Sequence, residues 1–129
     1  MRKVIATNNA PKAVGPYSQA IEANGTLYVS GQLPINPADG KMPEGIEAQT
    51  EQSLKNTGAI LAAAGCSFKD VVKSTVLLAD MNDFAAMNAV YARFYTEQMP
   101  ARVCYQVAKL PMGALVEIET TATIDSSDK

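Results

Sequence analysis

Arg102 and Cys104 are separated by one residue within the segment Pro100-Ala-Arg-Val-Cys-Tyr-Gln-Val107. In a β-strand this spacing places both side chains on one face and leaves Val103 and Tyr105 on the opposite, apolar face. A strand needs only one buried face to hold its place. The segment therefore predicts a strand that presents a cation and a thiol together on a surface free for chemistry.

A carboxylate follows the same pattern in the segment Leu115-Val-Glu-Ile-Glu-Thr120. Val116 and Ile118 would fill an apolar face, so that Glu117 projects from the other face. If both strands lie in one sheet, arginine, thiol and carboxylate could converge. Glu119 would share the face of Glu117, and either carboxylate could serve as a base or as an ion-pair partner.

The composition describes a globular chain without disulfides. The sequence has 129 residues, of which 47% are hydrophobic, and two cysteines, Cys66 and Cys104. This length fits a single domain over 1–129, with 125–129 expected to be a frayed tail. The first seven residues lack the apolar run of a secretory signal, and no stretch approaches a membrane span. A soluble, cytoplasmic protein is expected.

The absence of histidine excludes several classes of site. The sequence contains no histidine and has a net charge of −2. Ser-His-Asp and Cys-His nucleophile pairs and His-ligated zinc are therefore excluded. Cys104 has no imidazole base, which argues against covalent catalysis, and neither a metal nor a cofactor is expected. The acidic balance also argues against a nucleic-acid partner.

Periodicity and turn residues predict the elements that must position these side chains. The expected strands are 4–6, 17–23, 26–30, 71–79, 102–108 and 116–124. Asn24-Gly25 predicts a hairpin turn, and Gly65 predicts the end of a helix over about 46–64 that packs through Leu54, Gly58, Leu61 and Ala64. A second helix, capped by Asp80 or Asn82, would pack through Phe84, Met87, Tyr91 and Phe94.

This order of elements predicts an α+β fold, with two helices on one face of a single mixed, mostly antiparallel sheet. The second face of the sheet would remain uncovered. We expect that face to self-associate or to line a cleft between subunits. Along the last two strands it would carry Arg102, Cys104, Gln106, Glu117 and Glu119.

Short motifs in a characteristic order run through the whole sequence. They are Asn9-Ala-Pro11, Gly15-Pro-Tyr-Ser-Gln19, Ser30-Gly-Gln32, Asn82-Asp-Phe84, Asn88-Ala-Val-Tyr91, Pro100-Ala-Arg102 and Val116-Glu-Ile-Glu119. With these motifs the chain resembles the reactive intermediate deaminase A (RidA/YjgF) family, called the translation-inhibitor family in older descriptions.

The resemblance implies a homotrimer of chorismate-mutase-like protomers, with ligand sites in the clefts between subunits. It implies hydrolysis of 2-imino acids, such as 2-iminobutanoate and 2-iminopropanoate, to 2-oxo acids and ammonia. These imines arise from pyridoxal-phosphate dehydratases acting on threonine or serine, and they damage other enzymes. The function implied is metabolite damage control.

The resemblance also implies roles for individual residues. Arg102 would hold the substrate carboxylate, Glu117 would orient or deprotonate the attacking water, and Cys104 would contribute mainly backbone groups. The pocket would be shaped further by Tyr17, Ser30, Gly31 and Asn88. Val103 and the short 96–100 connection depart from relatives with serine before the cysteine and a longer loop, which affects the expected substrate preference.

Two other functions are compatible with the same residues. A non-enzymatic regulator could use an Arg102 pocket to bind 2-oxo acids or other small carboxylates. An RNA-acting protein is suggested by the older family name, although the acidic net charge argues against it. Turnover of an imine distinguishes the deaminase from both.

Overall fold

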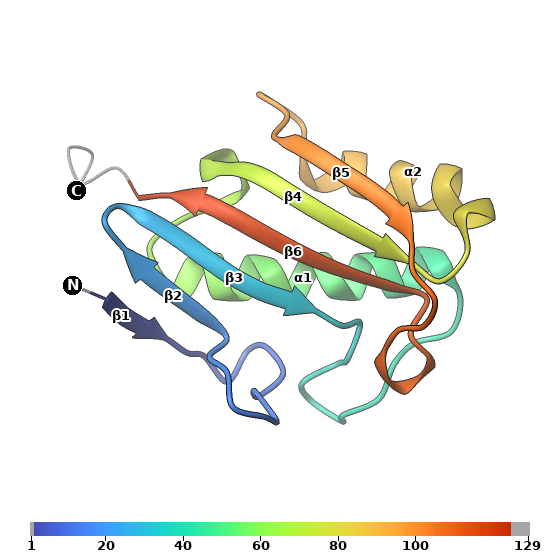
Figure 1. Ribbon diagram of the computed structural model, residues 1–129, viewed down its shortest axis with the longest axis horizontal. Coiled ribbons are helices and arrows are strands. Elements are labelled where there is room, and N and C mark those ends of the chain that lie inside the picture. The colour runs from blue at the N-terminus through green and yellow to red at the C-terminus, as the bar shows by residue number, and fades with distance from the viewer. Residues whose placement is uncertain (1, 125–129) are drawn as a thin grey trace.

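The computed structural model describes residues 2–124, which form one six-stranded sheet backed by helices (Figure 1). The strand order is β1-β2-β3-β6-β4-β5, and only β4 and β5 run parallel. The strands are β1 Arg2–Ile5, β2 Ala20–Ala23, β3 Thr26–Gln32, β4 Val71–Leu78, β5 Ala101–Gln106 and β6 Val116–Thr123. Because β5 lies at the sheet edge, it pairs with β4 alone.

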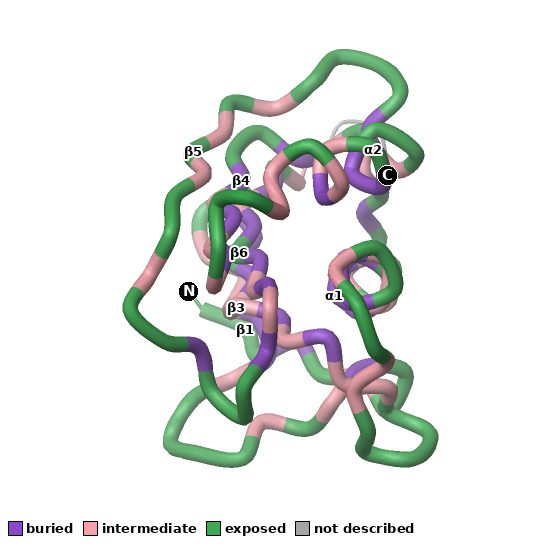
Figure 2. The backbone as a smooth tube through the Cα atoms, turned by 90° about the vertical axis from the view of Figure 1, so that its right-hand side faces the viewer, coloured by how far each residue is buried: buried purple, intermediate pink, exposed green. Residues whose placement is uncertain are grey.

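Two helices, α1 Ile46–Ala63 and α2 Phe84–Phe94, cover the same face of the sheet (Figure 2). Three short 3-10 helices, η1 Phe68–Asp70, η2 Met81–Asp83 and η3 Pro111–Gly113, connect elements. The predicted α+β class, with two helices on one face of a mixed, mostly antiparallel sheet, is confirmed. Within residues 2–124, neither helix is long and apolar enough to cross a membrane.

The predicted hairpin turn and the predicted end of α1 are confirmed by the backbone. Asn24 and Gly25 both have positive φ, 52° and 79°, as the hairpin turn between β2 and β3 requires. Gly65 has a φ of 79°. The Cys66 amide donates to the Leu61 carbonyl at 2.8 Å, which ends α1 in the expected way. The predicted cap of the second helix is wrong for α2 itself, whose N-cap is Asp83 without a side-chain hydrogen bond; Asp80 instead caps η2, which leads directly into α2.

The predicted strand from 17 to 23 is wrong in its first half. β2 begins at Ala20, and the segment before it is a loop. The buried Gln19 side chain holds this loop by accepting from the Thr7 amide at 2.7 Å and donating to the Pro11 carbonyl at 2.8 Å. These bonds replace the strand ladder, and they place Tyr17 outside the sheet. The expected tail, 125–129, lies outside the described residues.

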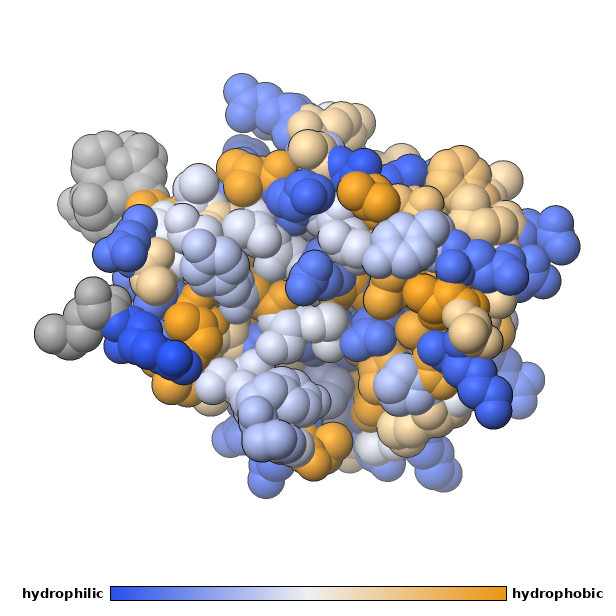
Figure 3. All heavy atoms as spheres, in the orientation of Figure 1, coloured by the Kyte–Doolittle hydropathy of each residue, from blue (hydrophilic) through white to orange (hydrophobic). Residues whose placement is uncertain are grey.

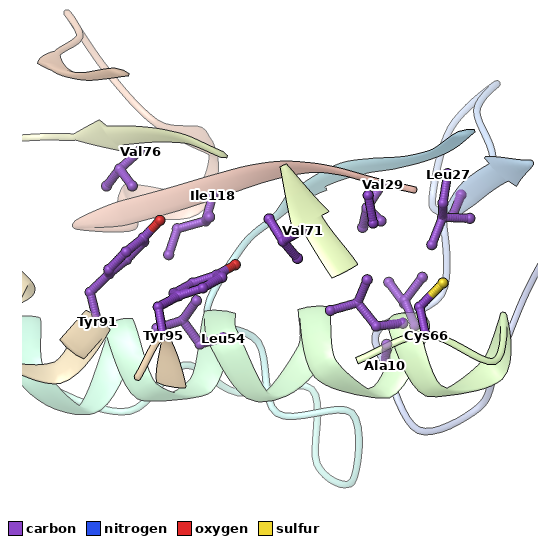
Figure 4. Packing of buried hydrophobic residues seen from close by; sticks show 14 of the residues in the cluster. Ala10, Leu27, Val29, Leu54, Cys66, Val71, Val76, Tyr91, Tyr95 and Ile118 are labelled. Carbon is purple, nitrogen blue, oxygen red and sulfur yellow. The ribbon is translucent and has the colours of Figure 1, made fainter. Parts of the chain in front are cut away.

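The core lies between the sheet and α1, as Figure 4 shows for Leu54, Val76 and Ile118. The predicted α1 stripe is confirmed for Leu54 and Leu61, which are fully buried. It is too narrow, because the buried face of α1 also carries Gln49, Thr50, Ser53, Asn56 and Thr57. Two of these polar residues form hydrogen bonds with loop backbone. The spacing of apolar residues in the sequence gives no sign of these bonds.

Asn56 is one of these two. Its Nδ2 donates to the carbonyls of Leu33 at 3.1 Å and Ile35 at 2.9 Å, and its Oδ1 accepts from Gln52. Gln49 acts similarly, since its Nε2 donates to the Pro43 carbonyl and its Oε1 accepts from the Leu115 amide. The long connection after β3 is therefore held by helix side chains.

We expect Asn56→Leu to lower the free energy of unfolding by about 2 kcal/mol, because two loop carbonyls lose their donor in a buried setting. Chemical denaturation at matched protein concentration measures the difference. The control is Lys55→Leu on the exposed side of the same turn, where little change is expected. Equal losses in the two variants would contradict the role of Asn56.

Candidate functional site

The strand β5 has its two faces the opposite way round from the prediction. Val103 and Tyr105 are 44% and 48% exposed, whereas Cys104 packs against the hydrophobic core. The prediction that the Arg102 and Cys104 face is uncovered is therefore wrong: this face is turned toward α2. The physical reason is that an edge strand on an open sheet can leave its more apolar face outside, for another surface to cover.

Arg102 lies between β5 and α2 and is held by three side chains of that helix. Its Nη1 donates to Asn88 Oδ1 at 2.8 Å. Its Cζ lies 4.8 Å from the ring centroid of Tyr91 and 5.7 Å from that of Phe84. The ion pairs found among residues 2–124 join Glu51 to Lys55 and Arg93 and do not include Arg102. The guanidinium thus keeps its charge and most of its N–H donors for another acceptor.

Cys104 lies on the same face as Arg102, as the spacing predicts. Burial raises the pKa of the Cys104 thiol, and the charge of Arg102 acts in the opposite direction with a smaller effect. At neutral pH the sulfur is therefore mainly protonated. This environment suits a pocket wall and does not favour a thiolate nucleophile.

Glu117 projects from the uncovered face and rests on the backbone of Gly31. A Cβ atom at Gly31 would lie 2.5 Å from Glu117 Oε2, so glycine leaves the room that the carboxylate occupies. Burial, and secondarily the charge of Glu119, raises the pKa of Glu117. A carboxylate with a raised pKa is a stronger base, which fits a group that takes a proton from water.

Gly31 belongs to a β-bulge in β3. Val29 pairs with Thr120 and Gln32 pairs with Ile118, so two residues of β3 oppose one of β6. The buried Gln32 side chain donates to the Ser30 carbonyl at 3.0 Å and closes the bulge. Bulges commonly redirect side chains beside functional sites. Here the bulge turns Ser30 and Gly31 toward the β6 carboxylates.

Ser30 and Tyr17 line a surface hollow of about 570 Å³ together with Glu119. Ser30 Oγ donates to the Ser18 carbonyl at 2.6 Å, which ties β3 to the loop before β2. Tyr17 follows the turn at Gly15 and is 51% exposed. The loop thus presents a phenol beside the bulge, on the face of the sheet opposite the helices.

The predicted site residues therefore form two groups. The cation half-site is Asn88, Arg102 and Cys104, and the carboxylate half-site is Tyr17, Ser30, Gly31 and Glu117. The strand register separates the two groups, because paired residues of neighbouring strands point to the same face of the sheet. Leu77 of β4 pairs with both Glu117 and the exposed Tyr105, which places Glu117 on the uncovered face. Arg102 pairs with Ser74, which also pairs with the buried Thr120, so Arg102 lies on the face covered by the helices. The predicted convergence on one face is wrong within a single protomer.

Sequence reasoning missed Phe84, Tyr91 and Gln32 as parts of the site. Phe84 and Tyr91 were expected only as core residues of the second helix. A signal was available, because Asn88 lies four residues after Phe84 and three before Tyr91, on the same face of the helix. A polar residue within an apolar helical stripe requires a hydrogen-bond partner. For Gln32 no such signal exists, since its role depends on the bulge.

A family model described as endoribonuclease L-PSP matches residues 7–124. The chain belongs to this family. It is 53% identical over 123 residues to the 2-iminobutanoate/2-iminopropanoate deaminase of Mus musculus, covering 95% of this chain and 91% of the mouse protein. The predicted membership of the RidA/YjgF family is confirmed.

Solved structures of this family have the same fold. The crystal structure of RidA from an Antarctic Psychrobacter matches with a TM-score of 0.92 and 48% identity over 95% of this chain and 99% of the other. Escherichia coli TdcF with bound serine matches with a TM-score of 0.93 and 42% identity over 95% of this chain and 99% of the other. The two-layer architecture described above is therefore that of the family.

The uncovered face, which carries the carboxylate half-site, mixes hydrophilic and hydrophobic side chains (Figure 3). Exposed Tyr28, Val103 and Tyr105 lie on it beside Glu117 and Glu119. Within residues 2–124, no cluster of three or more cysteine, aspartate or glutamate residues could hold a metal ion. The hollow on this face offers a ligand hydroxyl, backbone and carboxylate groups, together with the side chain of Arg2.

We expect Cys104 to be alkylated by iodoacetamide more slowly than a free small-molecule thiol at pH 8, with a rate that continues to rise above pH 9. A raised pKa leaves less thiolate at any given pH below it. Peptide mass spectrometry follows Cys104 separately from Cys66. A midpoint of the rate profile below pH 8 would contradict this environment.

Proposed function

We propose that this protein is a 2-iminobutanoate/2-iminopropanoate deaminase, which hydrolyses reactive 2-imino acids to 2-oxo acids and ammonia. The observation that carries the proposal is the Arg102 guanidinium, which is fixed by neutral partners and forms no ion pair with a described carboxylate. Such a group fits the carboxylate that every 2-imino acid carries. Relatives at about half identity are named for this activity.

We propose further that each site is assembled between protomers of a homotrimer. One protomer would supply the cation half-site and its neighbour the carboxylate half-site. The separation of Arg102 and Glu117 on opposite faces supports this, because a small imino acid cannot reach both within one chain. The exposed Val103 and Tyr105 on the open sheet face favour burial against another copy.

Glu117 would act on the water and Arg102 on the substrate. Arg102 binds the carboxylate, and the protonated imine carbon next to it is already electrophilic. Glu117 takes a proton from water as the oxygen adds to that carbon, which forms a 2-amino-2-hydroxy acid. Glu117 then passes this proton to the nitrogen and takes the hydroxyl proton as the carbon–nitrogen bond breaks. Ammonia leaves and is protonated to ammonium, and the 2-oxo acid remains. Every atom comes from the imine and water.

The remaining residues would shape the pocket. Asn88 fixes Arg102, while Ser30 and Gly31 place backbone groups at the bulge beside Glu117. Tyr17 would close the cleft from the loop before β2, and the protonated Cys104 would form a wall. The relative TdcF was solved with bound serine, which carries a carboxylate, as the proposed substrates do. Pyridoxal-phosphate dehydratases, acting in the same cytoplasm, would supply the imines.

We expect the protein to reduce semicarbazone formation when a threonine dehydratase acts on threonine in the presence of semicarbazide, because imine hydrolysis competes with trapping. Arg102→Ala should lower this activity by about a hundredfold or more, since both charge-assisted bonds to the carboxylate are lost. Glu117→Ala should slow turnover while the fold is retained. The matched control is Arg93→Ala, which removes an exposed arginine in the last turn of α2 that contacts Glu51.

Two results would contradict the deaminase. Unchanged trapping with the wild-type protein would exclude imine hydrolysis. Binding of 2-oxobutanoate without any imine turnover would favour the non-enzymatic regulator in its place.

The shared site makes a separate prediction for mixtures. Arg102→Ala and Glu117→Ala protomers, each with little activity alone, should regain about one quarter of wild-type activity after being unfolded, mixed in equal amounts and refolded. Random assembly leaves that fraction of clefts with an intact arginine from one protomer and an intact glutamate from the other. Native mass spectrometry checks for trimers, and absence of recovery in mixed trimers would exclude the shared site.

A further inference from the structure

The guanidinium of Arg102 lies at the end of a row of aromatic rings in contact with one another. Tyr91, over which Arg102 lies at 4.8 Å, is itself stacked on Tyr95 with ring centroids 4.5 Å apart and an interplanar angle of 26°. Tyr95 meets Phe68 edge to face at 5.1 Å, and Phe68 meets Phe94 at 5.5 Å. We call Tyr91, Tyr95, Phe68 and Phe94 the aromatic stack.

The aromatic stack packs against both the sheet and α1. Figure 4 shows Tyr91 and Tyr95 beside each other, with their hydroxyl ends toward the sheet. Both are buried, at 7% and 2% exposure. Phe68, from η1, presses on Gly58 of α1, where an added Cβ would lie 3.0 Å from the Phe68 ring. The Tyr91 ring therefore has little freedom to move away from Arg102.

A ring face differs from a carboxylate as a partner for this cation. A carboxylate would neutralise the charge and occupy the N–H edge that a substrate carboxylate needs. The electron-rich face of tyrosine attracts the cation through its quadrupole and contacts the guanidinium plane, so the N–H edge remains available. Asn88 then takes one N–H, which fixes rotation within that plane.

We propose that Tyr91 is the positioning residue that holds the Arg102 guanidinium in one plane, with its charge intact, for the carboxylate of the substrate. The inference rests on the deaminase proposed above and deepens it. Because the carboxylate is bound in the same way before and during the reaction, loss of the ring should weaken substrate binding and leave the chemical step almost unchanged. The hydroxyl lies near both Ser74 and Arg102, but it forms no hydrogen bond with a described residue, so we assign the positioning to the face of the ring.

The test compares four variants in the trapping assay. Tyr91→Leu, which removes the ring, should raise KM about tenfold with kcat within about twofold of wild type. Tyr91→Phe should stay close to wild type. Tyr91→pentafluorophenylalanine keeps the ring shape but reverses its quadrupole, so it should raise KM as Tyr91→Leu does. Because it still fills the ring's space, it tests the proposal even if the leucine variant folds poorly. Leu61→Ala is the control, because Leu61 is a fully buried core residue of α1 that lies outside the aromatic stack.

A purely structural role for Tyr91 predicts a different pattern. Tyr91→Leu and Leu61→Ala would then both lower the melting temperature without a change in KM, and the pentafluoro variant would behave like phenylalanine. Either result would overturn the proposal. Binding of 2-oxobutanoate, measured by calorimetry against the uncharged 2-oxobutanamide, should show the loss only for the charged ligand.

An NMR signature separates this inference from the deaminase itself. In the ligand-free wild type, the side-chain protons of Arg102 should be shifted upfield by the Tyr91 ring, and the shift should vanish in Tyr91→Leu but persist in Tyr91→Phe. Absence of the shift in wild type overturns the positioning role whatever the activity. If the upfield shift is present and 2-oxobutanoate binds but no imine is hydrolysed, only the deaminase is overturned. If the protein binds no 2-oxo acid, both proposals are overturned.

Discussion

Arg102 brings a permanent positive charge into the space between an edge strand and α2, where its close partners are an amide and two aromatic rings. A half-buried cation without a counter-charge is costly unless its contacts compensate. Much of the neighbouring structure can be understood from that requirement. The stripe Phe84, Asn88 and Tyr91 supplies the contacts, and the stack behind Tyr91 makes them rigid. The remaining attraction is available to an anion from outside the chain.

The local elements could be predicted from the sequence, because their signals are local. The Asn24-Gly25 turn, the end of α1 at Gly65 and the alternation of Val116, Glu117 and Ile118 each depend on a few adjacent residues. Alternation also placed Arg102 and Cys104 on one face correctly. It could not show which face the helices would cover, because that depends on how β5 pairs with β4 through the α2 crossover. The error in the site followed from this one missing fact.

The buried polar side chains were harder to predict for a related reason. Gln19, Gln32, Gln49 and Asn56 bind backbone groups of loops or of a bulge, and their partners are not encoded by any period. Each satisfies carbonyls that would otherwise be buried without donors. Gln19 holds the loop that carries Tyr17, and Gln32 holds the bulge that carries Ser30. The site thus depends on side-chain amides whose roles the pattern of apolar residues does not predict.

The parallel pairing of β4 and β5 has a consequence for how the two halves of the site come to exist. Arg102, Asn88, Tyr91 and Ser74 belong to one continuous β4-α2-β5 segment, so their contacts close over short stretches of chain. Gly31 and Glu117 meet only when β3 has paired with β6 across most of the sequence. Contacts of such different sequence separation differ in the loop entropy that must be overcome. A folding chain would therefore acquire its anion-binding corner before its base.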